Sequence, residues 1–181
     1  MKPGEKGYTL VELLIAMTIT VMATGAAGTA IFQVLRNTER NNDHITAVRQ
    51  VENAGYWISR DAQMAVSVNT TGDLVLPDFL SLSWTKWDDL GDPTYHSANY
   101  TFEDLTEVTY GIGKLKRTYG SSAGASEQTL VAQYIYYNPT DVDNTSSNTS
   151  YENQVLTVKL TAVFEEFVET REYKITRRVG F

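Results

Sequence analysis

One short segment of the sequence has the spacing of a hydrolase nucleophile. Gly120-Ser121-Ser122-Ala123-Gly124 matches the Gly-x-Ser-x-Gly pattern, in which a sharp strand-to-helix turn exposes a serine hydroxyl. Such a serine needs a helix directly after it and a histidine that takes its proton. Residues 129–137 have the pattern of a strand instead, and both histidines, His44 and His96, come before this segment. The sequence therefore predicts no serine hydrolase, and we expect no enzymatic activity.

Clusters of acidic residues point to a second kind of chemistry, the binding of a cation. Asp88, Asp89 and Asp92 lie in one predicted loop, and Asp141, Asp143 and Asn144 lie in another. Their oxygen atoms could coordinate calcium, although neither loop has the twelve-residue spacing of an EF-hand. Two histidines and no cysteine exclude a zinc site built from those ligands. We predict no cofactor and keep calcium as an alternative for the two loops.

The charge balance argues against nucleic acid as a partner. The chain has 15 Lys and Arg against 22 Asp and Glu, a formal charge of −7, so it has no broad attraction for phosphates. The basic groupings are residues 114–117 and 171–178, and the second includes Glu172 and follows Glu169. These cations are typical of a solvated strand face or a subunit contact, and a DNA-binding patch is the less favoured interpretation.

A single acidic residue, Glu12, lies at the start of a long apolar segment. From Leu13 to Leu35 there is no charged residue, and a helix of this length extends roughly 34 Å, enough to cross a hydrocarbon core of about 30 Å. An ordinary secretory signal would be shorter and would end at a small-residue cleavage site, which residues 26–30 could supply only loosely. A charge inside such a segment costs about 2.5–3.5 kcal/mol at mid-membrane, so Glu12 needs a partner.

The residues around Glu12 resemble the processing motif of class III prepilins. Lys6-Gly7-Tyr8-Thr9-Leu10-Val11-Glu12 has the basic residue and glycine, the aromatic residue, the threonine, the two aliphatic residues and the glutamate of that motif. In this family a membrane-embedded prepilin peptidase cuts after the glycine and methylates the new N-terminus. The resemblance implies a cleaved leader over residues 1–7, cleavage between Gly7 and Tyr8, and N-methylation of Tyr8.

The same resemblance gives Glu12 a role in assembly. Glu12 would be the fifth residue after the cut, and its carboxylate could pair with the cationic α-amine of a neighbouring subunit. Pairing offsets the cost of burying both charges, which makes an intramembrane carboxylate an assembly contact. The alternative is a glutamate that is merely tolerated near a membrane interface.

Beyond Leu35 the sequence predicts a continuing helix and then a β-rich head. No proline lies between Pro3 and Pro77, and one apolar stripe at helical spacing comprises Ile45, Val48, Val51, Gly55, Ile58, Ala62 and Ala65. We expect this stripe to pack on a sheet of the same chain, with an exposed coiled-coil helix as the alternative.

From Val66 the apolar pattern changes to period two, with about seven strand candidates. They include residues 80–84, 98–102, 107–112, 114–119, 129–137, 156–164 and 168–179, joined by loops near residues 88–93, 120–126 and 139–151. The predicted fold is α+β and pilin-like, with a long N-terminal helix packed on a mainly antiparallel sheet. Its predicted segments are a leader (1–7), a transmembrane or filament-core half of the helix (8–35), an amphipathic half (36–65) and a head (66–181).

The predicted function is that of a structural subunit of a type IV pilus or a type II secretion pseudopilus. The segment Tyr56-Trp57-Ile58-Ser59-Arg60-Asp61, the strand containing Leu115-Lys116-Arg117 and the two long closing strands resemble minor pilins or J-type minor pseudopilins. That resemblance implies three partners: the prepilin peptidase, other pilins in a helical filament, and an inner-membrane assembly platform. It also implies a single-pass protein of the cytoplasmic membrane, with its head outside the cytoplasm, that later enters the filament. The alternative is a membrane-anchored module whose head recognises a ligand, a surface or DNA.

Overall fold

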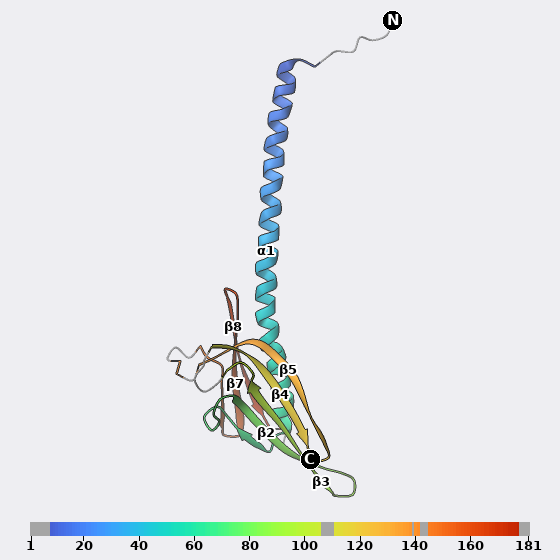
Figure 1. The fold of residues 1–181 in the computed structure, drawn as a ribbon, viewed down its shortest axis with the longest axis vertical. Helices are drawn as coiled ribbons and strands as arrows, with labels where there is room; N and C mark the ends of the chain where they lie inside the picture. Colours follow the sequence, from blue (N-terminus) through green and yellow to red (C-terminus); the bar gives the residue numbers. More distant parts are fainter. Residues whose placement is uncertain (1–7, 106–110, 139, 142–144, 178–181) are drawn as a thin grey trace. The chain divides into compact units, whose positions relative to one another are not determined.

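A computed structural model describes residues 8–105, 111–138, 140–141 and 145–177 of the chain. The chain divides into two compact units, Met1–Asn42 and Asp43–Phe181. One α-helix, α1 (Leu10–Met64), begins in the first unit and ends in the second (Figure 1). The helix is not interrupted at Gly25, at Gly28 or at residues 41–43, although these residues are poor helix formers. The long N-terminal helix predicted from the sequence is therefore confirmed.

Among its described residues, the second unit contains eight antiparallel strands that form one curled sheet. The strands are β1 (Ser67–Asn69), β2 (Asp78–Trp87), β3 (Pro93–Phe102), β4 (Gly111–Ser121), β5 (Gly124–Tyr137), β6 (Asn148–Glu152), β7 (Val155–Phe164) and β8 (Phe167–Thr176). Their order is β1-β2-β3-β4-β5-β7-β6, and β8 pairs with β7. This arrangement confirms the predicted α+β class with its antiparallel sheet.

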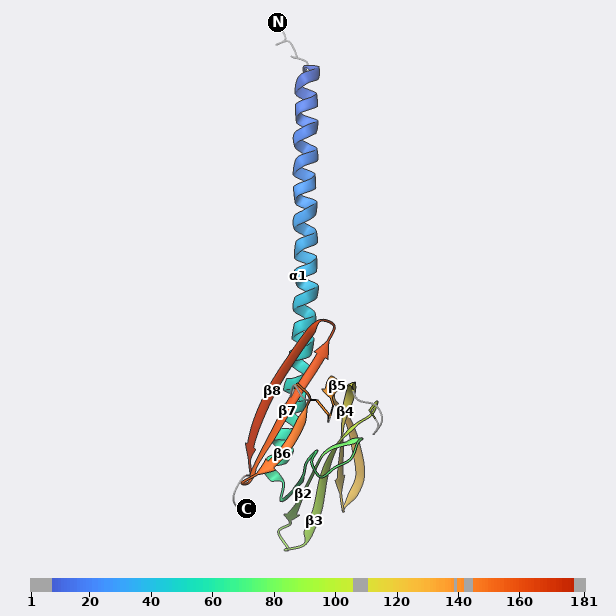
Figure 2. The ribbon, with the colours of Figure 1, turned by 90° about the vertical axis from the view of Figure 1, so that its left-hand side faces the viewer.

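Strand β7 joins the two halves of this sheet. It pairs with β8 from Val155 to Phe164, and its other edge is shared by β6 and by a single pairing with β5, Ile135↔Ala162. Figure 2 shows β6, β7 and β8 side by side, turned away from the group that contains β2 and β3. Among the described residues β5 and β7 share only that one pairing.

The end of α1 supplies one wall of the core within the second unit. Five of its apolar side chains are buried there: Ala47, Val51, Ala54, Ile58 and Ala62. The predicted stripe is confirmed at most of its positions, but Ile45 and Val48 are only half-buried. Because the curled sheet contacts more than one side of the helix, the buried face extends around to Ala47 and Ala54.

Gly55 lets a tyrosine from β8 pack directly on the helix backbone. A Cβ atom added at Gly55 would overlap the ring of Tyr173. The Tyr173 hydroxyl donates a hydrogen bond to the carbonyl oxygen of Val51 at 3.2 Å, and burial raises the pKa of this tyrosine. The predicted stripe thus contains a glycine because any side chain at position 55 would collide with Tyr173.

Two polar side chains of α1 bind the backbone of β5. Asn53 Nδ2 donates to the carbonyl oxygen of Val131 at 2.5 Å, and the backbone N–H of Gln133 donates to Oε1 of Gln50 at 2.7 Å. Among the described residues β5 pairs with β7 only at Ile135, so the helix side chains satisfy backbone groups of β5 near that join. These contacts fix α1 against the open part of the β5 edge.

A buried carboxylate, Asp61, ties α1 to β3 and β4. Arg117 binds it with two hydrogen bonds, Nε to Oδ2 at 2.5 Å and Nη2 to Oδ1 at 3.0 Å, and the Tyr100 hydroxyl donates to Oδ2 at 2.7 Å. Asp61 is fully buried and Arg117 is 4% exposed. The guanidinium also lies near the rings of Trp57, at 5.1 Å, and Tyr119, at 4.9 Å. This fully paired cluster fixes the register between helix and sheet.

The pKa values of the cluster shift in the directions that such pairing requires. Burial and the negative charge of Asp61 raise the pKa of Tyr100 well above its usual range. Burial alone would lower the pKa of Arg117, but its hydrogen bonds and ion pair with Asp61 raise it. Both residues therefore stay protonated in the folded protein.

We expect Tyr100→Phe to change how stability depends on alkaline pH. Folded Tyr100 keeps its proton while an unfolded tyrosine loses it near pH 10, so this residue stabilises the fold fully below about pH 10 and progressively less above it. The variant should lose about 1 kcal/mol at pH 7 with the hydrogen bond to Asp61, and its free energy of unfolding should fall less steeply above about pH 10. Denaturant titrations of the full chain in detergent at several pH values measure this slope.

The control for this variant is Tyr95→Phe, because Tyr95 is 62% exposed. It should leave both the stability at pH 7 and the alkaline slope unchanged. An alkaline slope that is the same in Tyr100→Phe and in the wild type would contradict the stated role of the cluster.

The structure differs from the predicted strands in three places. Strand β6 covers residues 148–152, of which residues 148–151 were predicted as the end of a loop, and the short strand β1 was not predicted. The predicted loop over residues 120–126 is a tight turn, since β4 ends at Ser121 and β5 begins at Gly124. Residues 107–110 of the strand predicted over 107–112 lie outside the described part of the chain.

Candidate membrane and assembly segment

The helix α1 begins with a reciprocal cap between Thr9 and Glu12. The backbone N–H and the hydroxyl of Thr9 both donate to Oε2 of Glu12, at 2.8 and 2.9 Å, and the N–H of Glu12 donates to Oγ1 of Thr9 at 3.3 Å. This is a capping box, which satisfies N–H groups that the first turn of a helix leaves without partners. In the single chain, Glu12 thus has a local structural role.

The sequence interpretation did not include this cap. A threonine followed three residues later by a glutamate, just before an apolar run, is the sequence signal that would have predicted it. Tyr8 is 89% exposed, while Gly7 lies outside the described residues. The structure therefore gives Glu12 a described partner, Thr9, and the predicted cleavage at Gly7/Tyr8 stays a prediction.

The apolar side chains of α1 in the first unit are exposed. They include Leu10 (81% exposed), Phe32 (76%), Val21 and Met22 (both 71%). A window of this helix has a mean hydropathy of 1.9, and α1 is the one helix among the described residues that is long and apolar enough to cross a membrane. Such a surface is costly in water, so it fits a helix that is covered by lipid or by other protein chains.

The threonine hydroxyls of this segment form hydrogen bonds within the helix. Hydroxyl groups donate to backbone carbonyls one turn earlier, from Thr18 to Leu14 at 2.8 Å and from Thr24 to Thr20 at 2.7 Å. Thr20 makes the same bond to Ala16. A hydroxyl satisfied in this way does not need water, which allows the segment to lie in hydrocarbon despite its threonine content.

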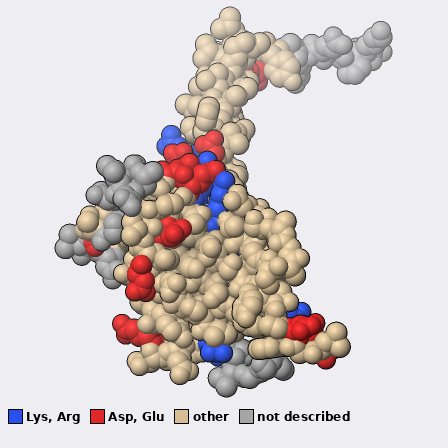
Figure 3. Space-filling model, turned by 60° about the horizontal axis from the view of Figure 1, so that its bottom comes forward, with Lys and Arg blue, Asp and Glu red and all other residues tan. Residues whose placement is uncertain are grey.

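Five cations of the basic groupings in the head form ion pairs with acidic groups among the described residues: Lys114, Lys116, Arg117, Arg171 and Lys174. Arg117 is buried with Asp61, and Lys116 lies 2.5 Å from Glu103. Arg171 pairs with Glu52 at 2.6 Å, and within this grouping Arg178 lies outside the described residues. Figure 3 shows acidic and basic side chains intermixed on one face of the molecule, as expected of a solvated surface rather than a phosphate-binding patch.

The serine motif and the first acidic cluster both lie in turns, where their side chains bind backbone N–H groups. Ser122 stands in the β4–β5 turn, where its hydroxyl oxygen accepts a hydrogen bond from the N–H of Tyr95 at 3.0 Å, and a strand rather than a helix follows. Asp88 accepts hydrogen bonds from the N–H groups of Leu90 and Asp92 within its own turn. Among the described residues no three His, Cys, Asp or Glu side chains are placed to hold a metal ion, and Asp143 and Asn144 lie outside those residues.

Comparison with known families identifies the N-terminal segment. Residues 2–28 match the model of the prokaryotic N-terminal methylation motif. The match supports a class III prepilin, a protein of the type IV pilin or pseudopilin kind. Families with this motif are structural rather than enzymatic, and the apolar helix α1 fits a membrane-anchored pilin. No curated protein and no solved structure matches the chain.

Proposed function

We propose that this protein is a minor structural subunit of a type IV pilus or a type II secretion pseudopilus. The observation that carries the proposal is the methylation motif at residues 2–28, which includes the start of an exposed apolar helix whose threonine hydroxyls are satisfied internally. Prepilin peptidase would remove residues 1–7 by cleavage between Gly7 and Tyr8, and Tyr8 would become the methylated N-terminal residue. Removal of the leader creates a free amine close to Glu12.

In this proposal the helix serves first as an anchor and then as an assembly element. Residues 8–35 hold the subunit in the cytoplasmic membrane, with residues 66–181 outside the cytoplasm. An inner-membrane assembly platform then moves the subunit into a filament, where apolar helices of neighbouring pilins replace lipid around it. Gly25 and Gly28 favour such packing, because both sites are open in the single chain and the missing side chains let the backbone of a neighbouring helix come close.

The proposal predicts a specific N-terminal peptide in filaments sheared from the native cells. Quantitative mass spectrometry should find a peptide that begins at N-methylated Tyr8, at a trace ratio to the most abundant pilin. A ratio near one would identify a major rather than a minor subunit. Processed chain that occurs only in the membrane fraction would favour the pseudopilus, and unprocessed chain in every fraction would refute the proposal.

A further inference from the structure

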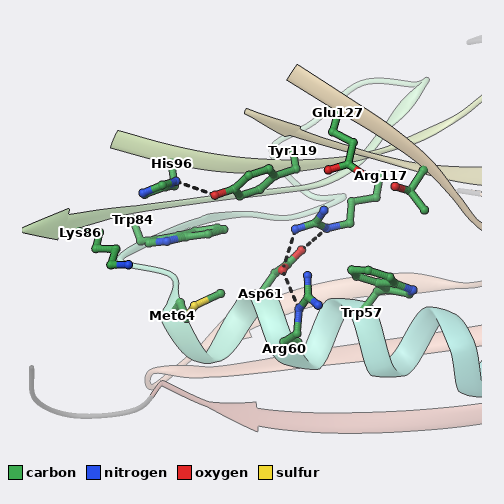
Figure 4. A pocket seen from close by; sticks show the side chains of 11 residues that line it. Trp57, Arg60, Asp61, Met64, Trp84, Lys86, His96, Arg117, Tyr119 and Glu127 are labelled. Atoms are coloured by element: carbon green, nitrogen blue, oxygen red, sulfur yellow. Dashed lines mark hydrogen bonds and ion pairs between the residues drawn. The ribbon is translucent and has the colours of Figure 1, made fainter. Parts of the chain in front are cut away.

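A pocket of about 350 Å³ lies within the second unit at the end of α1 (Figure 4). Its walls come from the last two turns of α1 and from β2, β3, β4 and β5. Figure 2 shows β2 and β3 continuing beyond the end of the helix, which leaves part of the inner sheet face without a helix over it. A pocket of this size with aromatic walls and a few polar groups is typical of a small-molecule site.

One wall of this pocket carries a buried nitrogen with no hydrogen-bond partner among the described residues. Trp84 and His96 are stacked with ring centroids 5.7 Å apart and an angle of 16° between their planes. Nδ1 of His96 is hydrogen-bonded to the Tyr119 hydroxyl at 2.7 Å, whereas Nε2 of His96 is buried and bonds to no described residue. Buried nitrogens are nearly always hydrogen-bonded, so Nε2 is a polar atom that a further hydrogen-bonding group would satisfy. In Figure 4, His96 and Lys86 lie at the same end of the pocket.

The charges of the pocket favour an anion. Its lining includes the cations Arg60, Lys86 and Arg117 and the anions Asp61 and Glu127. The carboxylate of Asp61 is already bound by Arg117, and neither Lys86 nor Glu127 forms an ion pair with a described residue. The Arg60 side chain is 46% exposed, its guanidinium carbon lies 4.2 Å from the centre of the Trp57 ring, and its Nε lies 3.7 Å from Oδ1 of Asp61. Lys86 is therefore the cation available to an incoming negative charge. Arg60 adds positive charge nearby although it also faces Asp61, and Glu127 opposes a multiply charged ligand.

The apolar part of the lining indicates which kind of molecule would carry the negative charge. Met64 on α1 and the ring of Trp84 on β2 form an apolar part of the lining, and Figure 4 shows the ring of Trp84 facing toward Met64. Trp84 is 8% exposed and Met64 is 46% exposed, so Met64 offers most of the apolar surface that a flat ring could pack against. A singly charged carboxylate joined to a flat ring satisfies both parts of the pocket.

We propose that this pocket binds an aromatic carboxylate, with its charge toward Lys86 and Arg60 and its ring against Trp84 and Met64. The carboxylate belongs either to a free organic acid or to the last residue of a peptide chain, which present the same chemistry. The proposal concerns the head alone and does not depend on the function proposed for α1.

The first test is a titration of the full chain, in non-ionic detergent, with phenylacetate. The indole N–H signals of Trp57 and Trp84 should shift saturably in NMR spectra, whereas that of Trp87, which is 64% exposed and not part of the lining, should not. Phenylacetamide has the same ring without the charge and should bind about tenfold more weakly. No saturable shift of the Trp84 signal, or equal affinity for the amide, would overturn the proposal.

A pair of lysine variants tests the location of the site. Lys86→Met should weaken phenylacetate binding about tenfold, because it removes an exposed cation without touching the core. Lys174→Met, which removes a cation paired with Glu172 on β8, should leave binding unchanged. Equal affinity in Lys86→Met and the wild type would exclude this pocket. If N-acetylphenylalanine binds more tightly than phenylacetate, the site recognises the C-terminus of a peptide. If it binds more weakly, the site recognises a free organic acid.

Discussion

Arg117→Met is expected to lower the free energy of unfolding of the full chain in detergent by about 3–5 kcal/mol. The variant leaves Asp61 fully buried without the two hydrogen bonds that Arg117 provides. The hydroxyl of Tyr100 still donates to it, but Arg60 Nε lies 3.7 Å from Oδ1 and is too distant to replace the lost bonds. An uncompensated charge in the core is among the most destabilising single changes a protein can carry.

The neighbouring residue on β4 provides a matched control. Lys116 also forms an ion pair, with Glu103 at 2.5 Å, but both side chains are about one third exposed. Lys116→Met should therefore cost at most about 1 kcal/mol, as is usual for surface pairs. Denaturant titration of both variants measures the difference.

A double variant separates the effect of the unpaired Asp61 charge from the effect of lost side-chain packing at Arg117. In Asp61→Leu/Arg117→Met the charge and its partner are removed together, so part of the stability lost in Arg117→Met should return. The hydroxyl of Tyr100 would lose its acceptor, which limits the recovery. Equal destabilisation by Arg117→Met and Lys116→Met would mean that burial of the pair has no energetic consequence.

The buried pair also shows where sequence reasoning stops. Arg117 was grouped with Lys114 and Lys116 as part of a solvated basic strand, yet it alternates with them and shares its face with buried Leu115. Period two alone could have indicated its burial. Its partner could not be predicted, because Asp61 lies 56 positions earlier and only the packing of α1 on the sheet brings the two together.

Other elements differ in how strongly their sequence specifies them. The helix α1 was predictable because Leu13–Leu35 has no charged residue, there is no proline from there to the end of the helix, and an apolar stripe at helical spacing follows. Strand β6 was not, because its residues, Asn148 to Glu152, are polar and it pairs only on one side with β7 among the described strands. The pocket could not be predicted from the sequence either, since its residues Trp84, His96 and Tyr119 belong to three different strands and come together only in the fold.

Glu12→Gln is expected to abolish incorporation of the subunit into filaments while the helix stays intact. Glutamine can take the place of glutamate in a capping box, so the hydrogen bonds with Thr9 can be kept. The negative charge is lost, and with it the proposed ion pair to the α-amine of a neighbouring subunit. Immunoblots of sheared filaments and of the membrane fraction measure incorporation, and mass spectrometry checks that the leader is still removed.

Thr9→Ala is the reciprocal variant, since it removes the hydroxyl of the cap and keeps the charge. Losing the cap costs about 1 kcal/mol of helix stability, too little to prevent assembly of a helix held by lipid or by neighbouring subunits. We therefore expect Thr9→Ala to enter filaments at close to the wild-type level. Glu12→Gln removes the charge and keeps the cap, whereas Thr9→Ala weakens the cap and keeps the charge. If Glu12→Gln assembled normally and Thr9→Ala did not, Glu12 would act as a cap alone.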